Sequence, residues 1–327
     1  MDSRSKILEL FRRCEGNFLS GEEISRSLGV SRTAVWKQIR SLREFGYDIE
    51  AVSSKGYRLL KRPDRLVGED IQTELDTSVV GRKVLCFEEL ASTNVMACEL
   101  GEKGEPEGTV VIADRQYAGK GRLGRRWESP SGVNLYASIL LRPEIPPWNA
   151  PQLTFVSAAA TAETIAHMHD LPARVKWPND VLIDGRKVSG LLNEMSGESE
   201  RLNYVVLGIG VNVNMEASQF PEGLRNPATS LAMEKGASVS RFDLTCSLLQ
   251  RLDSLYSLYL TQGFDPIRRR WEACCDLVGQ LVEIDQQGRI ERGCVRGVDA
   301  DGALLLEAAA GELVRVLAGD VRLLKRQ

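Results

Sequence analysis

The segment from Gln116 to Trp127, QYAGKGRLGRRW, combines residue types that bind anions. Its glycines are interleaved with four cationic side chains: Lys120, Arg122, Arg125 and Arg126. Glycine allows close backbone approach and positive φ, while Lys and Arg donate charge-assisted hydrogen bonds to phosphate or carboxylate oxygens. The segment therefore predicts an anion-binding loop.

The glycines of this segment also spell G-x-G-x-x-G, the fingerprint of dinucleotide-binding folds. That fingerprint requires a helix directly after the glycines, so that the helix N-terminus faces the pyrophosphate. Here residues 128–132, ESPSG, predict a turn, and residues 133–141 predict a strand. We therefore expect a mobile cationic lid between two strands. A basic surface hairpin that binds nothing is the alternative.

A second informative segment is RVKWPNDVLIDGRKVSGLLNE, residues 174–194. Asp184-Gly185 between two apolar runs predicts a β-hairpin with a two-residue type I′ turn. Pairing outward from that turn places four side chains on one face of the hairpin: Asp180, Leu182, Lys187 and Ser189. Asp180 and Lys187 become diagonal neighbours, so a carboxylate and an ammonium reach one surface. A solvated cross-strand salt bridge is the alternative interpretation.

Two more segments fit a polar ligand site. Ser92, Thr93 and Asn94 are consecutive small hydrogen-bonding residues before a predicted helix, a pattern that is also typical of a helix cap. The predicted strand YVVLGIGVNVN, residues 204–214, contains Gly208 and Gly210. Glycines inside a strand indicate close approach by a ligand or another backbone.

The first 62 residues differ from the rest in charge and pattern. They hold 13 Lys/Arg against 8 Asp/Glu, a net of +5, whereas the remainder carries −8. Helical spacing and capping patterns, followed by two alternating strands over residues 47–59, predict a winged helix-turn-helix. The expected DNA contacts are Arg32, Thr33, Trp36, Lys37, Arg40 and Lys55. A small helical domain used only for packing or protein contact is the alternative.

Composition excludes several classes of protein. No apolar run approaches the roughly 18 residues of a membrane span, and the N-terminus lacks the pattern of a signal peptide, so we expect a cytoplasmic protein. The seven cysteines include no C-x-x-C pair, which indicates neither a zinc site nor a disulfide framework. The last 50 residues predict four short strands of a small SH3-type barrel, which we expect to serve packing, docking or subunit contacts.

These motifs, in this order and behind a winged helix, resemble bifunctional biotin protein ligases that are also biotin-operon repressors. The resemblance covers essentially the whole chain. It implies an α+β multidomain fold with a winged-helix domain over 1–63, a ligase domain over 64–274 and an SH3-like barrel over 275–327. The ligase domain would have a mixed sheet similar to that of class II aminoacyl-tRNA synthetases. The implied enzyme is a biotin–[biotin carboxyl-carrier protein] ligase.

The resemblance also implies the site residues. Contacts to the biotin ureido ring or nearby polar atoms fall to Ser92, Thr93, Asn94 and Gln116. The loop over the carboxylate and adenylate is matched by Lys120, Gly121 and Arg122, with Trp127 in the same binding set. The catalytic set is Lys187, Arg122 and Asp180, and Asp180 is the candidate Mg²⁺ ligand. The chain has Lys120 where the family often has Arg, and Leu123 where it often has Arg or Met.

The implied reaction joins biotin to AMP from ATP with Mg²⁺ and then transfers biotin to one lysine of a carrier domain of a carboxylase. An acyl-adenylate is already reactive, so no enzyme nucleophile is expected. Biotinyl-AMP would also act as corepressor by ordering a homodimer that binds operator DNA. Three alternatives stay open: a non-catalytic biotin-sensing regulator, a lipoate-type acyl ligase, and a ligase whose N-terminal domain no longer binds DNA.

Overall fold

The computed structural model describes residues 3–14, 16–224, 226–286, 288–309 and 311–324. The chain divides into two compact units, Met1–Asp76 and Thr77–Gln327. None of the helices formed by the described residues is both long and apolar enough to cross a membrane.

The first unit is the winged helix-turn-helix that the sequence predicts. Its elements are α1 (Ser3–Arg13), α2 (Gly21–Leu28), α3 (Arg32–Glu44), β1 (Asp48–Val52), β2 (Gly56–Lys61) and α4 (Gly68–Glu74). The predicted capping box is present, because the Ser20 hydroxyl accepts from Glu23 N–H while the Glu23 carboxylate accepts from Ser20 N–H. Ile24, Val35 and Ile39 are fully buried between the helices.

This unit continues past residue 63, where the sequence analysis ended the first domain, to Asp76. The reason is a set of polar contacts from α4. Asp70 is buried and accepts hydrogen bonds from the Arg4 guanidinium at 3.4 Å and from the Tyr47 hydroxyl. Arg62 forms an ion pair with Glu74 at 2.8 Å. These bonds tie α4 to the helices and the wing.

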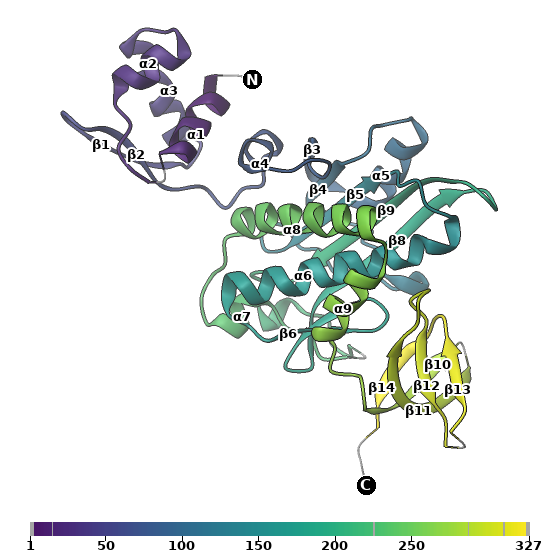
Figure 1. The fold of residues 1–327 in the computed structure, drawn as a ribbon. Coiled ribbons are helices and arrows are strands. Elements are labelled where there is room, and N and C mark those ends of the chain that lie inside the picture. The colour runs from purple at the N-terminus through teal and green to yellow at the C-terminus, as the bar shows by residue number, and fades with distance from the viewer. Residues whose placement is uncertain (1–2, 15, 225, 287, 310, 325–327) are drawn as a thin grey trace. The chain divides into compact units, whose positions relative to one another are not determined.

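The second unit is built on a mixed seven-stranded sheet (Figure 1). In spatial order its strands are β3 (Lys83–Leu90), β4 (Thr109–Gln116), β5 (Leu135–Leu141), β9 (Leu202–Val211), β8 (Arg186–Gly197), β7 (Asp180–Ile183) and β6 (Ala173–Lys176). Only β3 and β4 pair in parallel, and the other neighbours are antiparallel. The predicted mixed sheet is therefore confirmed.

Helices cover both faces of this sheet. They are α5 (Thr93–Glu102), α6 (Leu153–His169), α7 (Leu231–Lys235), α8 (Arg241–Gln262) and α9 (Asp265–Ala273), with short 3₁₀ turns η1 (Arg122–Gly124), η2 (Pro147–Gln152) and η3 (Ala217–Gln219). Helices α6 and α8 pack side by side (Figure 1). Two consecutive side chains of β8 show that α5 and α6 lie on opposite faces. The Asn193 amide donates to Thr154 of α6 at 2.8 Å, whereas the Glu194 carboxylate accepts from Asn94 of α5 at 2.7 Å.

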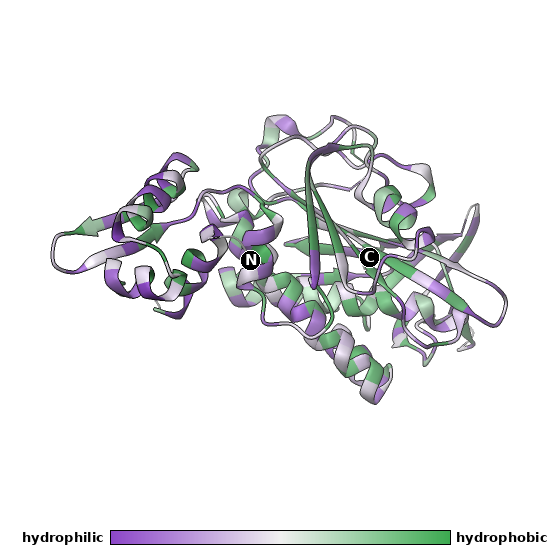
Figure 2. Cartoon of the chain, turned by 90° about the horizontal axis from the view of Figure 1, so that it is seen from above, coloured by the Kyte–Doolittle hydropathy of each residue, from purple (hydrophilic) through white to green (hydrophobic). Residues whose placement is uncertain are grey.

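Burial follows from this layering. All seven residues of β5 are buried, because neighbours flank the strand on both edges and helices cover both faces. Figure 2 shows the hydrophobic residues concentrated along the strands of the central sheet, with mixed colouring on the surrounding helices. That mixture is expected of helices with one buried face.

The C-terminal part of this unit is a five-stranded antiparallel sheet, coloured yellow in Figure 1. Its strands are β10 (Leu281–Gln286), β11 (Arg289–Val298), β12 (Leu304–Glu307), β13 (Leu313–Val316) and β14 (Asp320–Leu323), in the order β13-β12-β11-β10-β14. The sequence analysis predicted four of these strands and missed β14. That strand has only one buried apolar side chain, Val321, and is defined by its pairing with β10.

Candidate active site

A cavity of about 430 Å³ lies against the face of the central sheet that α5 covers. Its wall contains every residue that the sequence analysis placed in the ligand site: Ser92, Thr93, Asn94, Gln116, Lys120, Gly121, Arg122, Trp127, Asp180 and Lys187. These residues come from three separate segments of the chain. The fold therefore brings the predicted set together in one place.

One end of the cavity has a network of buried amides and hydroxyls. The Thr93 N–H donates to Gln116 Oε1 at 2.8 Å, and Gln116 Nε2 donates to Ser129 at 2.9 Å. Asn94 Nδ2 donates to the Leu192 carbonyl and to Glu194, while its oxygen accepts from Ser138. Both amide hydrogens of Asn94 are thus committed to protein partners, so this side chain mainly orients its neighbours.

Ser92 occupies a different position within the same triplet. It stands at the N-cap of α5, yet its side chain makes no capping bond. Across the described part of the chain, no hydrogen bond of its hydroxyl is present, although the residue is buried against the cavity. The capping alternative therefore does not account for Ser92, and its hydroxyl remains available to a ligand.

The glycines of β8 and β9 make room for side chains. Gly190 and Gly210 lie directly opposite each other, and a Cβ on either would come within 2.8 Å of the Trp127 indole. A Cβ on Gly208 would lie 2.1 Å from the Asn94 amide oxygen. The sequence analysis expected a ligand or another backbone at Gly208 and Gly210. The Trp127 and Asn94 side chains come close to these glycines, and both glycines also line the cavity, so close approach by a ligand there stays a prediction.

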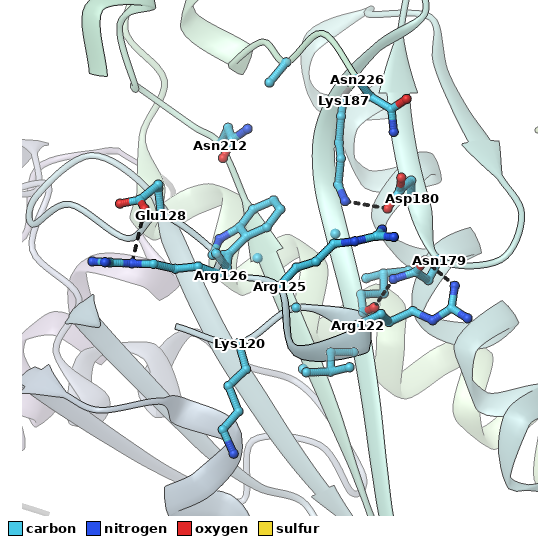
Figure 3. A pocket seen from close by; sticks show the side chains of 18 of the residues that line it. Lys120, Arg122, Arg125, Arg126, Glu128, Asn179, Asp180, Lys187, Asn212 and Asn226 are labelled. Atoms are coloured by element: carbon cyan, nitrogen blue, oxygen red, sulfur yellow. Dashed lines mark hydrogen bonds and ion pairs between the residues drawn. The ribbon is translucent and has the colours of Figure 1, made fainter. Parts of the chain in front are cut away.

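The cationic segment connects β4 to β5, as predicted, and its cations have different partners (Figure 3). Arg122 donates to Asn179 at 3.3 Å, and burial lowers the pKa of its guanidinium. Arg125 forms an ion pair with Asp320, and that hydrogen bond raises its pKa. Arg126 pairs with Glu128 at 3.2 Å. The Lys120 side chain points away from Lys187 and Asp180 (Figure 3).

Lys187 and Asp180 meet in the cavity wall as an ion pair of 2.6 Å (Figure 3). The Lys187 ammonium also lies 5.3 Å from the centre of the Trp127 ring, a cation–π distance. Both side chains are largely buried, with exposed fractions of 25% and 15%. The pair is thus not the freely solvated salt bridge of the alternative interpretation, and it presents an ordered ammonium to the cavity.

The register of this hairpin differs from the expected one by a bulge. Asp180 lies opposite Gly190 and Val181 opposite Ser189, because the pairing shifts between Val181 and Leu182 and leaves Val188 as an extra residue. The prediction that Asp180 and Lys187 share a face is confirmed. The placement of Ser189 on that face was wrong, since Ser189 opposes the buried Val181 and is itself fully buried.

The donor set suits a metal ion only in combination with a phosphate ligand. Within the described ranges, no cluster of three or more His, Cys, Asp or Glu residues could hold a metal ion. Asp180 already accepts from the Lys187 ammonium. Mg²⁺ typically needs one or two protein carboxylates when substrate phosphates supply the other oxygens. Asp180 therefore fits an ATP-bound Mg²⁺ better than an independent metal site.

Several wall residues were not predicted from the sequence. They are Asn179, Asn212, Phe220, Leu224, Asn226, Asp320, Val321 and Arg322. Asn179 lies within the KWPND motif and was the most accessible to sequence reasoning. Residues 320–322 begin β14, so the C-terminal domain, which was expected to serve packing, docking or subunit contacts, also contributes to the cavity wall. Residues 215–224 have no sequence pattern that would have revealed their position.

The predicted DNA contacts all lie on exposed positions of the first unit. Arg32, Thr33, Trp36, Lys37 and Arg40 project from α3, and Lys55 lies in the turn between β1 and β2. Arg32 pairs with Glu22 at 2.7 Å, and the Arg40 guanidinium lies 5.8 Å from the Trp36 ring centre. The exposed Arg32–Glu22 ion pair is weak and can exchange for a phosphate contact.

Three family models match consecutive parts of the chain. An HTH domain matches residues 3–58, the biotin/lipoate A/B protein ligase family matches residues 86–212, and the biotin protein ligase C terminal domain matches residues 278–324. The fold and the site thus define a ligase of the biotin/lipoate class joined to a helix-turn-helix domain.

Similar full-length proteins combine the same parts. The bifunctional ligase/repressor BirA of Bacillus subtilis (strain 168) is 40% identical over 320 residues, 98% of each chain. That of Escherichia coli (strain K12) is 34% identical over 293 residues, 89% of each chain. A solved biotin protein ligase from Aquifex aeolicus, in complex with biotin and ATP, superposes with a TM-score of 0.65 at 29% identity, covering 75% of this chain and 100% of that one. The chain belongs to the family of bifunctional biotin ligase/repressors.

Proposed function

We propose that this cavity converts biotin and ATP into biotinyl-5′-AMP and pyrophosphate, and then transfers biotin to a lysine of a biotin carboxyl carrier domain. The observation that supports this proposal most is the convergence of the Lys187–Asp180 pair, the cationic lid and the Ser92 triplet on one cavity of about 430 Å³. That volume lies within the range of small-molecule sites, about 300–1,000 Å³.

The first step brings two anions together. A biotin carboxylate oxygen attacks the α-phosphorus of ATP, and the bond from that phosphorus to the pyrophosphate breaks. Negative charge develops on the α-phosphate oxygens, and preorganised donors stabilise it. Lys187 is our candidate for this role, with Arg122 as a second cation. Asp180 holds the Lys187 ammonium in place and would be the protein ligand of a Mg²⁺ that screens the phosphates.

The remaining wall residues bind and orient the ligand. Ser92 is the candidate donor or acceptor for the ureido ring, while Thr93, Asn94 and Gln116 hold that end of the cavity rigid. Trp127 supplies an apolar surface next to Lys187. Lys120 and Gly121 belong to the lid, which would exclude water from the mixed anhydride until an acceptor arrives.

The second step needs no nucleophile from the enzyme. The amine of the carrier lysine attacks the acyl carbon, an amide forms, and AMP leaves as the mixed anhydride breaks. The lysine must lose a proton to react, and the phosphate group of the departing AMP is the simplest acceptor of that proton. The lid must move aside for a carrier domain to reach this carbon.

The first unit would make the protein a repressor with biotinyl-5′-AMP as corepressor. We propose a homodimer in the adenylate-bound state, since two linked helix-turn-helix units bind two half-sites far more tightly than one. The proposed organisation is a DNA-binding domain that extends past residue 63 to Asp76, a ligase domain to about residue 274 and a C-terminal domain beyond. ATP, carrier protein and operator DNA would all meet the chain in the cytoplasm.

The decisive experiment measures pyrophosphate release by the full chain with ATP, Mg²⁺ and biotin, with lipoate as the control acid. A biotin carboxyl carrier domain is added in a second reaction and examined for biotin by mass spectrometry. Biotin-dependent release followed by carrier labelling is the expected result. Biotin binding without pyrophosphate would identify a sensor, and release with lipoate alone would identify a lipoate-type ligase.

The repressor half is tested with Arg32→Ala. We expect weaker binding to DNA upstream of biotin synthesis genes, a smaller salt dependence of that binding, and unchanged ligation, because a phosphate contact is lost. Arg13→Ala is a matched control, since Arg13 is also exposed and paired with a glutamate but lies on α1. Equal DNA affinity of the Arg32 and Arg13 variants over a salt series would contradict the assignment.

A further inference from the structure

The lid over the cavity is a small β-hairpin with a turn of its own. Lys120 and Arg126 pair as an antiparallel bridge. The backbone bonds are Gly121 N to Arg125 O at 2.7 Å, Arg125 N to Arg122 O at 3.2 Å, and Trp127 N to Gly119 O at 2.9 Å. The turn between the two arms is Leu123-Gly124, and both residues have positive φ, 57° and 72°. Leu123 and Gly124 are thus the central residues of a type I′ β-turn, and the first arm has one extra residue, because Gly121 and Arg122 both face Arg125.

Leucine is a poor residue for the first position of such a turn. In the left-handed region its Cβ crowds the following carbonyl oxygen, which disfavours the conformation by a factor of about 5–30. Type I′ turns accordingly prefer Asn, Asp or Gly at this position. The Leu123 side chain is 59% exposed, so packing does not compensate for the backbone conformation.

The rest of the hairpin has little stability to spare. Two-stranded hairpins are marginal in water without a packed face. From Lys120 to Arg126 every residue is exposed or half-buried. The arms are held by the long Arg122–Asn179 hydrogen bond and by the Arg125–Asp320 ion pair, whose arginine is 49% exposed. They are also held by the packing of Trp127 against the glycines of β8 and β9. The conformational penalty at Leu123 is therefore comparable in free energy with the contacts that keep the lid closed.

We propose that the left-handed conformation of Leu123 raises the free energy of the closed lid until it is close to that of the open lid. This conformation thereby sets how often the lid leaves the cavity. The penalty exists only while the turn is formed, because an opened, flexible segment lets Leu123 return to negative φ. The residue therefore favours the open state selectively. The inference rests on the proposed function for its consequence: adenylate formation needs the closed lid, and delivery to a bulky carrier domain needs the open one.

The first test follows the lid without any ligand. Hydrogen exchange of the peptide containing residues 117–127 is measured by mass spectrometry in the wild type, Leu123→Asn and Leu123→Ala. Asn tolerates the left-handed region, whereas Ala keeps the Cβ penalty and removes only the exposed side chain. We expect exchange in the Asn variant to be about fivefold slower than in the Ala variant, a factor that corresponds to about 1 kcal/mol. Equal exchange in the two variants would overturn the proposal.

The second test follows ligand release. The dissociation rate of biotinol-adenylate, a non-hydrolysable analogue, is measured by chase with excess unlabelled compound. Leu123→Asn is expected to release it about fivefold more slowly than the wild type and Leu123→Ala, if about 1 kcal/mol of closed-state strain is removed. Identical release rates would show that the turn does not gate the cavity.

These outcomes separate the inference from the proposed function. If the wild type does not bind the analogue at all, the biotin ligase assignment fails, while the exchange experiment still decides the opening equilibrium of the hairpin. If the analogue binds and pyrophosphate is released but the Asn and Ala variants behave alike in both tests, only the role of Leu123 fails.

Discussion

Two hairpins deliver cations to the same cavity, and they share one turn geometry. The β7–β8 hairpin turns at Asp184 and Gly185, with φ of 48° and 75°, and the lid turns at Leu123 and Gly124, with φ of 57° and 72°. Asp184 suits the left-handed region and Leu123 does not. The same backbone shape is thus formed once with a favourable residue and once against the residue's preference.

The surroundings of the two hairpins differ in the same sense. Strands β7 and β8 lie between β6 and β9, and Val181, Ile183 and Val188 are buried there. The backbones of the two lid arms pair with each other, and none of their side chains between Lys120 and Arg126 is fully buried. Under the proposed function this difference is a division of roles: Lys187, which would act on the reacting atoms, lies on rigid structure, whereas the lid, which would have to move, contains a weak turn.

The largest effect is expected from removing the cation of the rigid β7–β8 hairpin. Lys187→Ala should lower the rate of adenylate formation by about 10²–10³, the typical cost of removing a preorganised donor to developing charge. Biotin-dependent pyrophosphate release measures it. Arg186→Ala is the control, because Arg186 pairs with Glu234 and does not line the cavity. Near wild-type release by the Lys187 variant would rule out its role.

An intermediate effect is expected where the lid meets the sheet. Gly210→Ala places a methyl group 2.7 Å from the Trp127 indole, so the lid anchor must shift. We expect ligand affinity to weaken by about 1–3 kcal/mol, the usual cost of overpacking, as measured by calorimetry with biotin and ATP analogue. In a Trp127→Ala background the same change should have little effect. A loss of equal size in both backgrounds would exclude the indole clash.

The smallest effect sharpens the comparison of the turns. Asp184→Leu imposes on the β7–β8 hairpin the residue type found in the lid, and should lower stability by about 1 kcal/mol, or roughly 2–4 °C in Tm. Asp184→Asn should leave Tm unchanged, because Asn tolerates the left-handed region. Exchange in residues 117–127 should stay at the wild-type rate in both variants. Faster lid exchange in Asp184→Leu would mean that the two hairpins are coupled and not independent.

Local signals in the sequence were sufficient for much of the site. The Asp184-Gly185 turn and the two-residue alternation around it predict that Asp180 and Lys187 share a face, and they do so at 2.6 Å. The bulge at Val188 was not predictable, because it arises from pairing with strands that lie elsewhere in the sequence. Beyond the bulge the partners of Val181 and Asp180 are shifted by one residue, and Ser189 therefore leaves the face that Asp180 and Lys187 share.

Contacts between residues far apart in the sequence could not be predicted from the sequence. Gly208 and Gly210 indicate that something comes close, but not that it is Asn94 and Trp127. Likewise, nothing in residues 320–323 indicates a strand whose first residue pairs with Arg125 of the lid. These partners are separated by tens to hundreds of residues, and only packing of the whole unit selects them.

The sequence by itself determined the composition of the site, the winged helix N-terminal to it and the position of the Asp184-Gly185 turn, because these depend on residue types, periodicity and turn chemistry over a few neighbouring residues. The tertiary structure alone decided the partners: Lys187 pairs with Asp180, Trp127 packs against Gly190 and Gly210, and Arg125 of the lid pairs with Asp320 of β14. Partner choice depends on which surfaces are buried together, and burial is a property of the folded chain as a whole.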